Sequence, residues 1–328
     1  MKEINILITS AGRRVELINC FQKAKRYLNI TGNIVAADAS ETAPACFFAD
    51  KRYQVCRIDD DKYIMQLIEI CKNERIHLIV PTIDTELIKL SQSKTQIENE
   101  CGAKVLISGQ KVIDICRDKY KTVDFFLKNE LTAPRYITKS DLEEDNYQFP
   151  LFIKPLNGSS SINAFKVHNQ KELEFFTDYI ENYILQDFVE GKEYTIDAFC
   201  DFKGNPITIV PRQRLAVRSG ESLKGVTEKN QLIINEVKKV LNILKPIGQI
   251  TLQGILDDQE SVFSFIEINP RFGGGAPMSI AAGADSCINL YKLLLGETLT
   301  YNEEFQEGLL GIRFDQAIFI NEKGQKND

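Results

Sequence analysis

Three side chains able to bind a metal ion or a phosphate lie within five residues of one another. Glu267, Asn269 and Arg271 occur in the run Phe-Ile-Glu-Ile-Asn-Pro-Arg-Phe-Gly-Gly-Gly, residues 265–275. We predict a strand over 262–268. Glu267 and Asn269 are two residues apart and therefore point to the same face of it, and Pro270, which has no N–H to donate, ends the hydrogen bonding of the strand. A carboxylate, an amide oxygen and a guanidinium there suit a magnesium ion carrying a polyphosphate. The alternative is an edge strand with a surface salt bridge.

A second group of candidate phosphate ligands lies in residues 149–167, which predict a strand, a small hydroxyl-rich turn and a second strand. Lys154 comes near the end of the first strand and supplies a point charge. The turn exposes backbone N–H groups and hydroxyls that can surround phosphate oxygens, and its residues include Gly158, Ser159, Ser160 and Ser161. Glycine and serine also dominate ordinary turns, so the turn indicates phosphate binding only together with Lys154.

The densest positive charge in the chain occurs between residues 212 and 224. We expect Arg212, Arg214, Arg218 and Lys224 to lie in a loop, because few apolar residues separate them. Such a segment is often a solvated surface. In an acidic protein it is also a candidate clamp for an anion.

Composition limits the classes of function. The formal net charge is −6 and the isoelectric point is about 5.3, which argue against a nucleic-acid-binding protein. Eight cysteines are scattered singly and only two histidines are present, so we expect no zinc site and a reducing compartment. No signal peptide is visible, and no apolar run reaches the roughly 20 residues of a membrane span. We therefore expect a cytoplasmic protein that binds neither membrane nor nucleic acid.

The first ~110 residues alternate between strands and helices, which predicts an open parallel sheet covered by helices on both faces. Strands are expected at 4–8, 34–37, 53–56, 77–80 and 105–107, with helices at 13–28, 62–74 and 85–101. The first loop lacks the G-x-G-x-x-G fingerprint of dinucleotide sites. Asp38, Asp84 and Glu86 follow strand ends, where they either meet a substrate or cap helices and turns.

The remaining chain predicts a mixed α+β arrangement. We expect helices at 114–131, 170–179, 228–244, 278–284 and 288–295, and strands at 183–189, 207–211, 251–256 and 262–268. The last two strands would form a hairpin that places Gln253 beside Glu267. We divide the chain into three parts: an α/β domain at 1–113, a first lobe at 114–190 and a second lobe at 191–328.

These features together resemble the ATP-grasp superfamily. Residues 117–275 resemble an ATP-grasp domain, and the preceding unit resembles the amino-terminal domain of biotin carboxylases. The opening run Ile-Leu-Ile-Thr-Ser-Ala-Gly-Arg-Arg-Val-Glu-Leu, residues 6–17, is similar to carbamoyl-phosphate-synthase-like chains. The resemblance covers nearly the whole chain. It implies that ATP lies between two lobes.

The resemblance also implies roles for individual residues. Lys119 and Lys154 match the basic residues on the phosphates, and residues 157–161 match the mobile loop above them. The adenine-reading hinge is matched by Gln186, Phe188 and Val189, and the ribose carboxylate by Glu193. The magnesium ligands are matched by Gln253, Glu267 and Asn269. Arg271 matches the residue that steadies the transferring phosphoryl group, and Arg214 is our candidate for the acceptor carboxylate or the acyl phosphate. Two positions depart from common patterns: Gln253 replaces a carboxylate, and Asn163 replaces a glycine.

The implied activity is ligation of a carboxylate to an amine through an acyl phosphate, with ATP and Mg²⁺ (or Mn²⁺) as cofactors and ADP and phosphate as products. The partners would be the small-molecule carboxylate and amine substrates and, in a homodimer, a second copy of the chain. With one grasp unit and no repeat, we do not expect complete carbamoyl phosphate synthesis. The alternative is a catalytically reduced ATP-binding regulatory or scaffold protein. A dinucleotide-dependent oxidoreductase is disfavoured by the missing glycine fingerprint.

Overall fold

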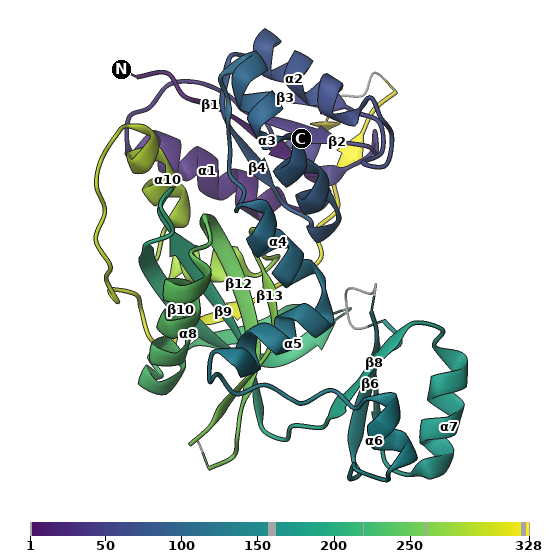
Figure 1. Cartoon of the computed structure of the whole chain (residues 1–328). Helices are drawn as coiled ribbons and strands as arrows, with labels where there is room; N and C mark the ends of the chain where they lie inside the picture. The colour runs from purple at the N-terminus through teal and green to yellow at the C-terminus, as the bar shows by residue number, and fades with distance from the viewer. Residues whose placement is uncertain (1, 157–161, 219, 260, 323–325, 328) are drawn as a thin grey trace.

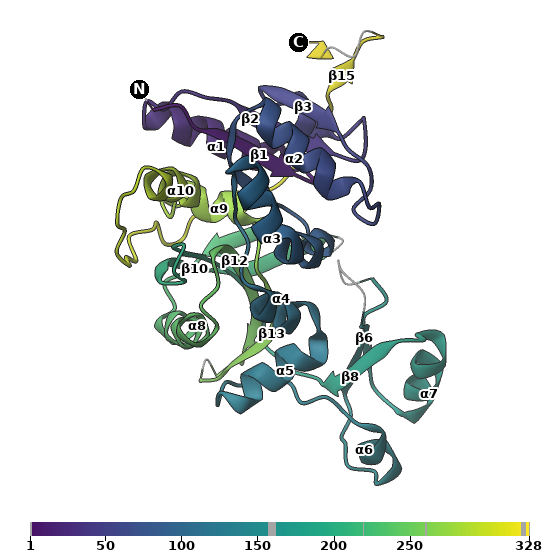
Figure 2. The same ribbon diagram turned by 45° about the horizontal axis from the view of Figure 1, so that its top comes forward.

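Three of the four β-sheets in the described residues organise the chain, as the computed structural model shows (Figure 1). The structure describes residues 2–156, 162–218, 220–259, 261–322 and 326–327. The amino-terminal sheet and a three-stranded sheet lie at opposite ends of the molecule, with a six-stranded sheet between them (Figures 1 and 2). No helix in these described ranges is both long and apolar enough to cross a membrane.

The amino-terminal sheet is parallel, with strand order β3-β2-β1-β4-β5, which confirms the predicted class. Its strands are β1 (Asn5–Thr9), β2 (Ile34–Asp38), β3 (Lys51–Gln54), β4 (Ile76–Pro81) and β5 (Lys104–Val105). Its helices are α1 (Val15–Tyr27), α2 (Tyr63–Asn73) and α3 (Leu87–Cys101). Alternation along β1 divides the core, because Ile6 and Ile8 pack with α1 whereas Leu7 packs with α2 and α3. The third strand begins earlier than predicted.

The single helix predicted over 114–131 is wrong. The structure has two helices there, α4 (Gln110–Arg117) and α5 (Lys119–Lys128). Asp118 between them is extended and its side chain accepts a hydrogen bond from the backbone N–H of Lys121. An aspartate is a strong N-cap, and here capping outweighs the continuous helical pattern. The break makes Lys119 the first residue of a helix.

The three-stranded sheet contains the predicted hairpin and has a small core of its own. Its order is β7-β6-β8, with β6 (Leu151–Pro155), β7 (Phe165–Val167) and β8 (Tyr183–Asp187) all paired antiparallel. Helices α6 (Lys139–Glu143) and α7 (Gln170–Tyr179) accompany it. Ile153, Leu173 and Leu185 are buried together, so this sheet is held by a separate cluster.

The six-stranded sheet is antiparallel and carries most of the candidate site. Its order is β13-β12-β9-β10-β11-β14. The strands are β9 (Lys192–Cys200), β10 (Pro206–Arg218), β11 (Glu221–Thr227), β12 (Gly248–Leu256), β13 (Phe263–Asn269) and β14 (Leu310–Ile312). Helix α8 (Gln231–Leu244) buries its apolar residues against the sheet.

The predicted loop around Arg212 and Arg214 is also wrong. Strand β10 continues through Arg218 and pairs with β11 in the register Arg212–Thr227. Arg212 and Arg214 are two residues apart and therefore lie on one face of the strand. Each has an acidic partner in the structure, which allows a polar sequence to form a buried strand.

The carboxyl-terminal region returns to the amino-terminal sheet. Helices α9 (Ala276–Ala281) and α10 (Ser286–Leu294) lie beside α1. The ring of Phe21 is 5.8 Å from that of Phe272 and 6.2 Å from that of Tyr291, measured between centroids. Beyond them β15 (Phe319–Ile320) pairs with β16 (Lys326–Asn327), and the Lys326 ammonium lies 4.5 Å from the centroid of the Phe48 ring. Residues far apart in sequence thus form one core.

We predict that Phe126→Ala destabilises the protein strongly. The Phe126 ring is fully buried and stacks on Phe265 of β13 at 4.8 Å, so truncation leaves a cavity and costs about 3–5 kcal/mol. Thermal and urea unfolding measure the loss. The control is Phe175→Ala, because Phe175 is 62% exposed and its truncation should change stability by less than about 1 kcal/mol. Equal effects of the two variants would contradict the packing described here.

Candidate active site

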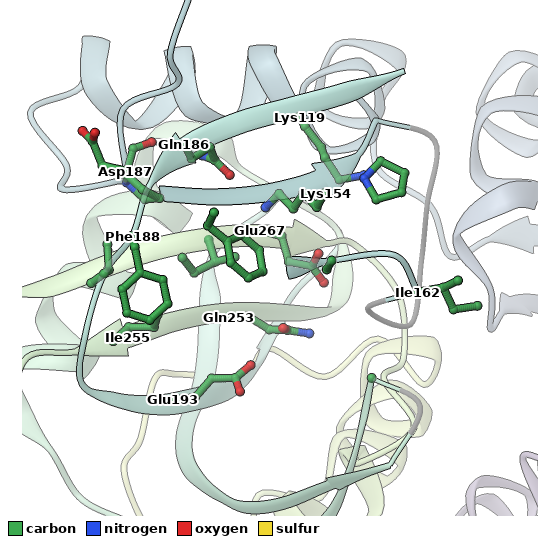
Figure 3. A pocket seen from close by; sticks show the side chains of 17 residues that line it. Lys119, Lys154, Ile162, Gln186, Asp187, Phe188, Glu193, Gln253, Ile255 and Glu267 are labelled. Carbon is green, nitrogen blue, oxygen red and sulfur yellow. Dashed lines mark hydrogen bonds between the residues drawn. The ribbon is translucent and has the colours of Figure 1, made fainter. Parts of the chain in front are cut away.

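Two cavities that share lining residues lie against the six-stranded sheet, and the smaller faces the three-stranded sheet whereas the larger faces the amino-terminal domain. The smaller, of about 290 Å³, extends from the backbone around Asp187 to Glu267. In Figure 3, Lys119, Lys154 and Gln186 lie on one side of it, and Glu193, Gln253 and Ile255 lie on the other. The larger, of about 640 Å³, continues toward the amino-terminal domain. Residues shared by both linings are Lys119, Gly220, Gln253, Ile266 and Glu267.

One end of the smaller cavity is apolar and suits a planar ring. Phe188, Val189 and Ile255 line it together with Phe152 and Ala164. Gln186 is buried in β8, and its Nε2 donates to the Pro134 carbonyl at 3.1 Å. The predicted hinge residues Gln186, Phe188 and Val189 therefore come together at one wall.

The two candidate phosphate-binding lysines lie at the other end and influence each other. Burial lowers the pKa of Lys154 to about 8, with Glu267 opposing the shift and Lys119 adding to it. Burial also lowers the pKa of Lys119, and Glu267 again opposes the shift. Because Glu193 in the same cavity is paired with Arg214, the two ammonium groups and the Glu267 carboxylate leave a net positive charge in a poorly hydrated place, which favours an anion.

Strand pairing brings the three candidate metal ligands together. Gln253 of β12 is the cross-strand partner of Glu267 of β13, and Thr251 is the partner of Asn269. The Asn269 Nδ2 atom donates to Glu267 Oε1 at 2.6 Å, which leaves the amide oxygen available to a cation. In the described part of the chain, no group of three or more His, Cys, Asp or Glu could hold a metal ion. A set of one carboxylate and two amides fits Mg²⁺ best when phosphate oxygens complete the coordination.

Arg214 connects the two cavities. Its Nη1 atom donates to Glu193 Oε1 at 2.6 Å and to Gln253 Oε1 at 3.1 Å, and its Nη2 atom donates to the Gly220 carbonyl at 2.8 Å. Its side chain is 3% exposed. Burial raises the pKa of Glu193, and Arg214 opposes that shift. The candidate ribose carboxylate is therefore held by the candidate acceptor-binding arginine.

Arg271 is held from the amino-terminal domain. Its Nε atom donates to Asp84 Oδ2 at 3.1 Å and its Nη2 atom donates to the same oxygen. Asp84 lies just after β4 and was an open candidate from sequence, so the structure places it beside a predicted site residue. The two residues are 187 positions apart, and only the fold brings them together.

The sequence did not identify three residues that line the larger cavity, Arg14, Arg117 and Glu221, whereas Arg212, which also lines it, belongs to the expected anion clamp. Arg14 Nη1 donates to Glu221 Oε1 at 3.0 Å, and Arg212 Nη2 lies 2.8 Å from Asp197 Oδ2. A further signal in the sequence was the glycine run at 273–275. An added Cβ at Gly274 would lie 2.7 Å from Arg14 Nη1, and one at Gly275 would lie 2.7 Å from Arg212 Nη2. Because these two glycines have no side chain, the guanidinium groups of Arg14 and Arg212 can lie against the backbone here.

The predicted phosphate loop, residues 157–161, lies entirely outside the described residues, and with it Gly158, Ser159, Ser160 and Ser161. Asn163 follows it with φ of +56°. This left-handed conformation favours glycine and is tolerated by asparagine, which accounts for the departure from the common glycine.

Comparison with known families agrees with this geometry. Residues 116–275 match the ATP-grasp domain, and residues 6–106 match the PylC-like N-terminal domain. The chain therefore carries an ATP-grasp domain preceded by a PylC-like amino-terminal domain. This confirms the predicted superfamily and architecture.

Individual relatives are distant. A D-alanine–D-alanine ligase of Francisella tularensis subsp. novicida is 27% identical over 180 residues, covering 51% of this chain and 60% of that protein. A carbamoyl-phosphate synthase of Methanobrevibacter smithii is 21% identical over 250 residues, covering 70% of this chain and 66% of that protein. The chain spans less than two thirds of the length of both curated relatives.

The solved structures extend the likeness in fold to nearly the whole chain. The biotin carboxylase domain of Hydrogenobacter thermophilus 2-oxoglutarate carboxylase, a dimer in complex with MgADP, ADP and bicarbonate, has a TM-score of 0.73 and 17% identity. The likeness covers 93% of this chain and 73% of that one. At this identity it establishes the fold alone.

We predict that the titration of Lys154 responds in opposite directions to its two charged neighbours. In the free protein, labelling of Lys154 by a small amine-reactive reagent should rise with a midpoint near pH 8, because only the uncharged amine reacts. Glu267→Gln removes an opposite charge and should lower the midpoint, whereas Lys119→Met removes a like charge and should raise it. Peptide mass spectrometry reads the labelling. Glu297→Gln, at an exposed position, is the control, and equal shifts in both site variants would refute the charge cluster.

Proposed function

We propose that this protein is an ATP- and Mg²⁺-dependent ligase that joins a carboxylate to an amine through an acyl phosphate. The convergence of Lys119 and Lys154 on Glu267, beside Gln253 and Asn269, carries the proposal. The ATP-grasp match supports ATP as the nucleotide, and the MgADP-bound biotin carboxylase domain and the D-alanine–D-alanine ligase support this class of chemistry.

The residues present fit MgATP. The apolar wall at Phe188, Val189 and Ile255 suits an adenine ring, and Glu193 suits the ribose hydroxyls. Lys119 and Lys154 match the charge of the phosphates, and Gln253, Glu267 and Asn269 would hold the ion. Bound there, Mg²⁺ would neutralise phosphate charge.

The residues of the chain would then act mainly by positioning and by charge. In the first step a carboxylate oxygen attacks the γ-phosphorus, the bond to ADP breaks, and Lys119 and Lys154 neutralise charge on the transferred group. Arg271, fixed by Asp84, would steady that group, and Arg214 would bind the substrate carboxylate or the acyl phosphate. In the second step the amine nitrogen attacks the acyl carbon, a C–N bond forms, phosphate leaves and the nitrogen loses a proton.

The proposal also covers the organisation and location of the protein. We propose that the chain divides into three parts, 1–113, 114–190 and 191–328, that it forms a homodimer, and that it is cytoplasmic. The free, mostly buried thiols among the described cysteines suit a reducing compartment. Within this class of ligase, the more specific activity that we propose is a carbamoyl-phosphate-synthase-like reaction. The competing function is an ATP-binding regulatory protein without turnover, against which the retained lysines and oxygen ligands argue.

We predict that Glu267→Gln abolishes turnover while the fold survives. ADP release is measured with MgATP, a panel of carboxylates and hydroxylamine, which traps any acyl phosphate as a hydroxamate. Loss of the carboxylate should lower the rate at least about 100-fold, because charge neutralisation contributes most of the catalysis in such a reaction. Glu297→Gln should retain the wild-type rate. Wild-type protein that binds MgATP but releases no ADP with any carboxylate would favour the regulatory protein instead.

We also predict that Arg214→Ala raises the KM for the carboxylate. The variant loses a buried guanidinium that is aligned by Glu193, Gln253 and Gly220, so kcat/KM should fall by about 10-fold or more. The matched control is Arg218→Ala on the same strand, because Arg218 is 53% exposed and pairs with Asp315. An unchanged kcat/KM in Arg214→Ala would remove Arg214 from the site.

A further inference from the structure

Among the described residues, one guanidinium that lines the larger cavity has no acidic partner. Arg14, Arg212, Arg214 and Arg271 each form an ion pair. The side chain of Arg117, at the end of α4, lines the same cavity and forms no ion pair with the other residues described. Its Nε atom is buried and has no hydrogen-bond partner. A buried donor without a partner is costly, so this one indicates a missing acceptor.

The same cavity contains a carboxylate oxygen without a partner. Asp84 uses Oδ2 for Arg271, whereas its Oδ1 is buried and accepts no hydrogen bond from any described group. Asp84 and Arg117 both act on the thiol of Cys116: burial raises its pKa, Asp84 adds to the shift and Arg117 opposes it. The two unsatisfied groups therefore lie in one neighbourhood and do not pair with each other.

We propose that the larger cavity binds an amino acid as its zwitterion, and that this amino acid is the carboxylate substrate of the reaction proposed above, on which the inference rests. Arg117 would bind the carboxylate together with Arg214, which lines the same cavity, because a guanidinium pairs with a carboxylate in a bidentate way. Asp84 would accept hydrogen bonds from the ammonium group. A ligand with both charges satisfies both groups, whereas a dicarboxylate would place a like charge against Asp84 and a simple amine would leave Arg117 unpaired.

The position of the two residues fixes the orientation of this substrate. Arg117 is two residues before Lys119, which lines both cavities, so the carboxylate would face the phosphate end. Asp84 follows β4 of the amino-terminal domain, so the ammonium would face that domain. Paired with Asp84, the ammonium would stay protonated and would not act as the nucleophile. The acceptor amine is then a separate molecule.

The test compares amino acids with analogues in which a hydroxyl replaces the amino group. Binding of each of the twenty L-amino acids and D-alanine is measured by calorimetry with MgADP present, and every amino acid that binds is compared with its 2-hydroxy analogue. Arg117→Gln should weaken both by about 10- to 100-fold, because both carry the carboxylate. Asp84→Asn should reduce the preference for the amino acid by about 10-fold or more. The asparagine still offers an oxygen to Arg271 but removes the negative charge, so this variant tests the contact with the ammonium group.

Matched controls come from an exposed pair. Arg57 and Asp59 form a surface ion pair with side chains more than 80% exposed, so Arg57→Gln and Asp59→Asn should leave binding unchanged. The inference is overturned if no amino acid binds, if hydroxy acids bind as well as amino acids, or if Arg117→Gln has no effect. ADP release with hydroxylamine separates the two proposals. If ADP is released only with carboxylates that lack an amine, the amino-acid substrate is wrong and the ligase activity stands. If an amino acid binds but no ADP is released, the ligase activity is wrong and the amino-acid site stands.

Discussion

The candidate site depends on the pairing of charged side chains that come from different strands and domains. Arg271 meets Asp84, Arg14 meets Glu221, Arg212 meets Asp197 and Arg214 meets Glu193. The first two pairs join the amino-terminal domain to the six-stranded sheet. The Arg212–Asp197 pair is fully buried, and removing one partner of such a pair typically costs about 3–5 kcal/mol, since the other charge remains without compensation. The relative position of the domains and the charge of the cavity are therefore determined by the same contacts.

Close packing around these charges explains features that local sequence rules leave open. Gly274 and Gly275 lie against Arg14 and Arg212, where any side chain would collide with a guanidinium. Arg13 and Arg14 are adjacent, yet only Arg14 lines the cavity. On β10 the alternation of side chains places Arg212 and Arg214 toward the site, while Leu215 is 50% exposed. A polar strand is stable here because each inward arginine has an acceptor.

The sequence predicted the elements that short-range patterns determine. The parallel sheet, the hairpin around Lys154 and the pairing of Gln253 with Glu267 all follow from apolar periodicity and turns, and the structure has them. The continuous helix over 114–131 was wrong because one capping residue, Asp118, outweighed the apolar pattern. Asp84 and Arg271 could not be paired from sequence, because nothing near either residue specifies a partner 187 positions away. Arg117 could not be identified either, since its significance lies in the contact that it lacks.

Neither sheet alone holds the charges that a polyphosphate would need. Lys154 is on β6 of the small sheet, Glu267 is on β13 of the large sheet, and Lys119 begins the helix that follows the amino-terminal domain. Glu267 nevertheless affects the pKa of both lysines, so the three groups share one poorly hydrated space. Two cations near one carboxylate are unfavourable without a further anion. The fold tolerates this excess of positive charge because packing elsewhere holds each strand in place. The excess positive charge is thus the clearest physical reason to regard this cavity as a binding site and not as an interior defect.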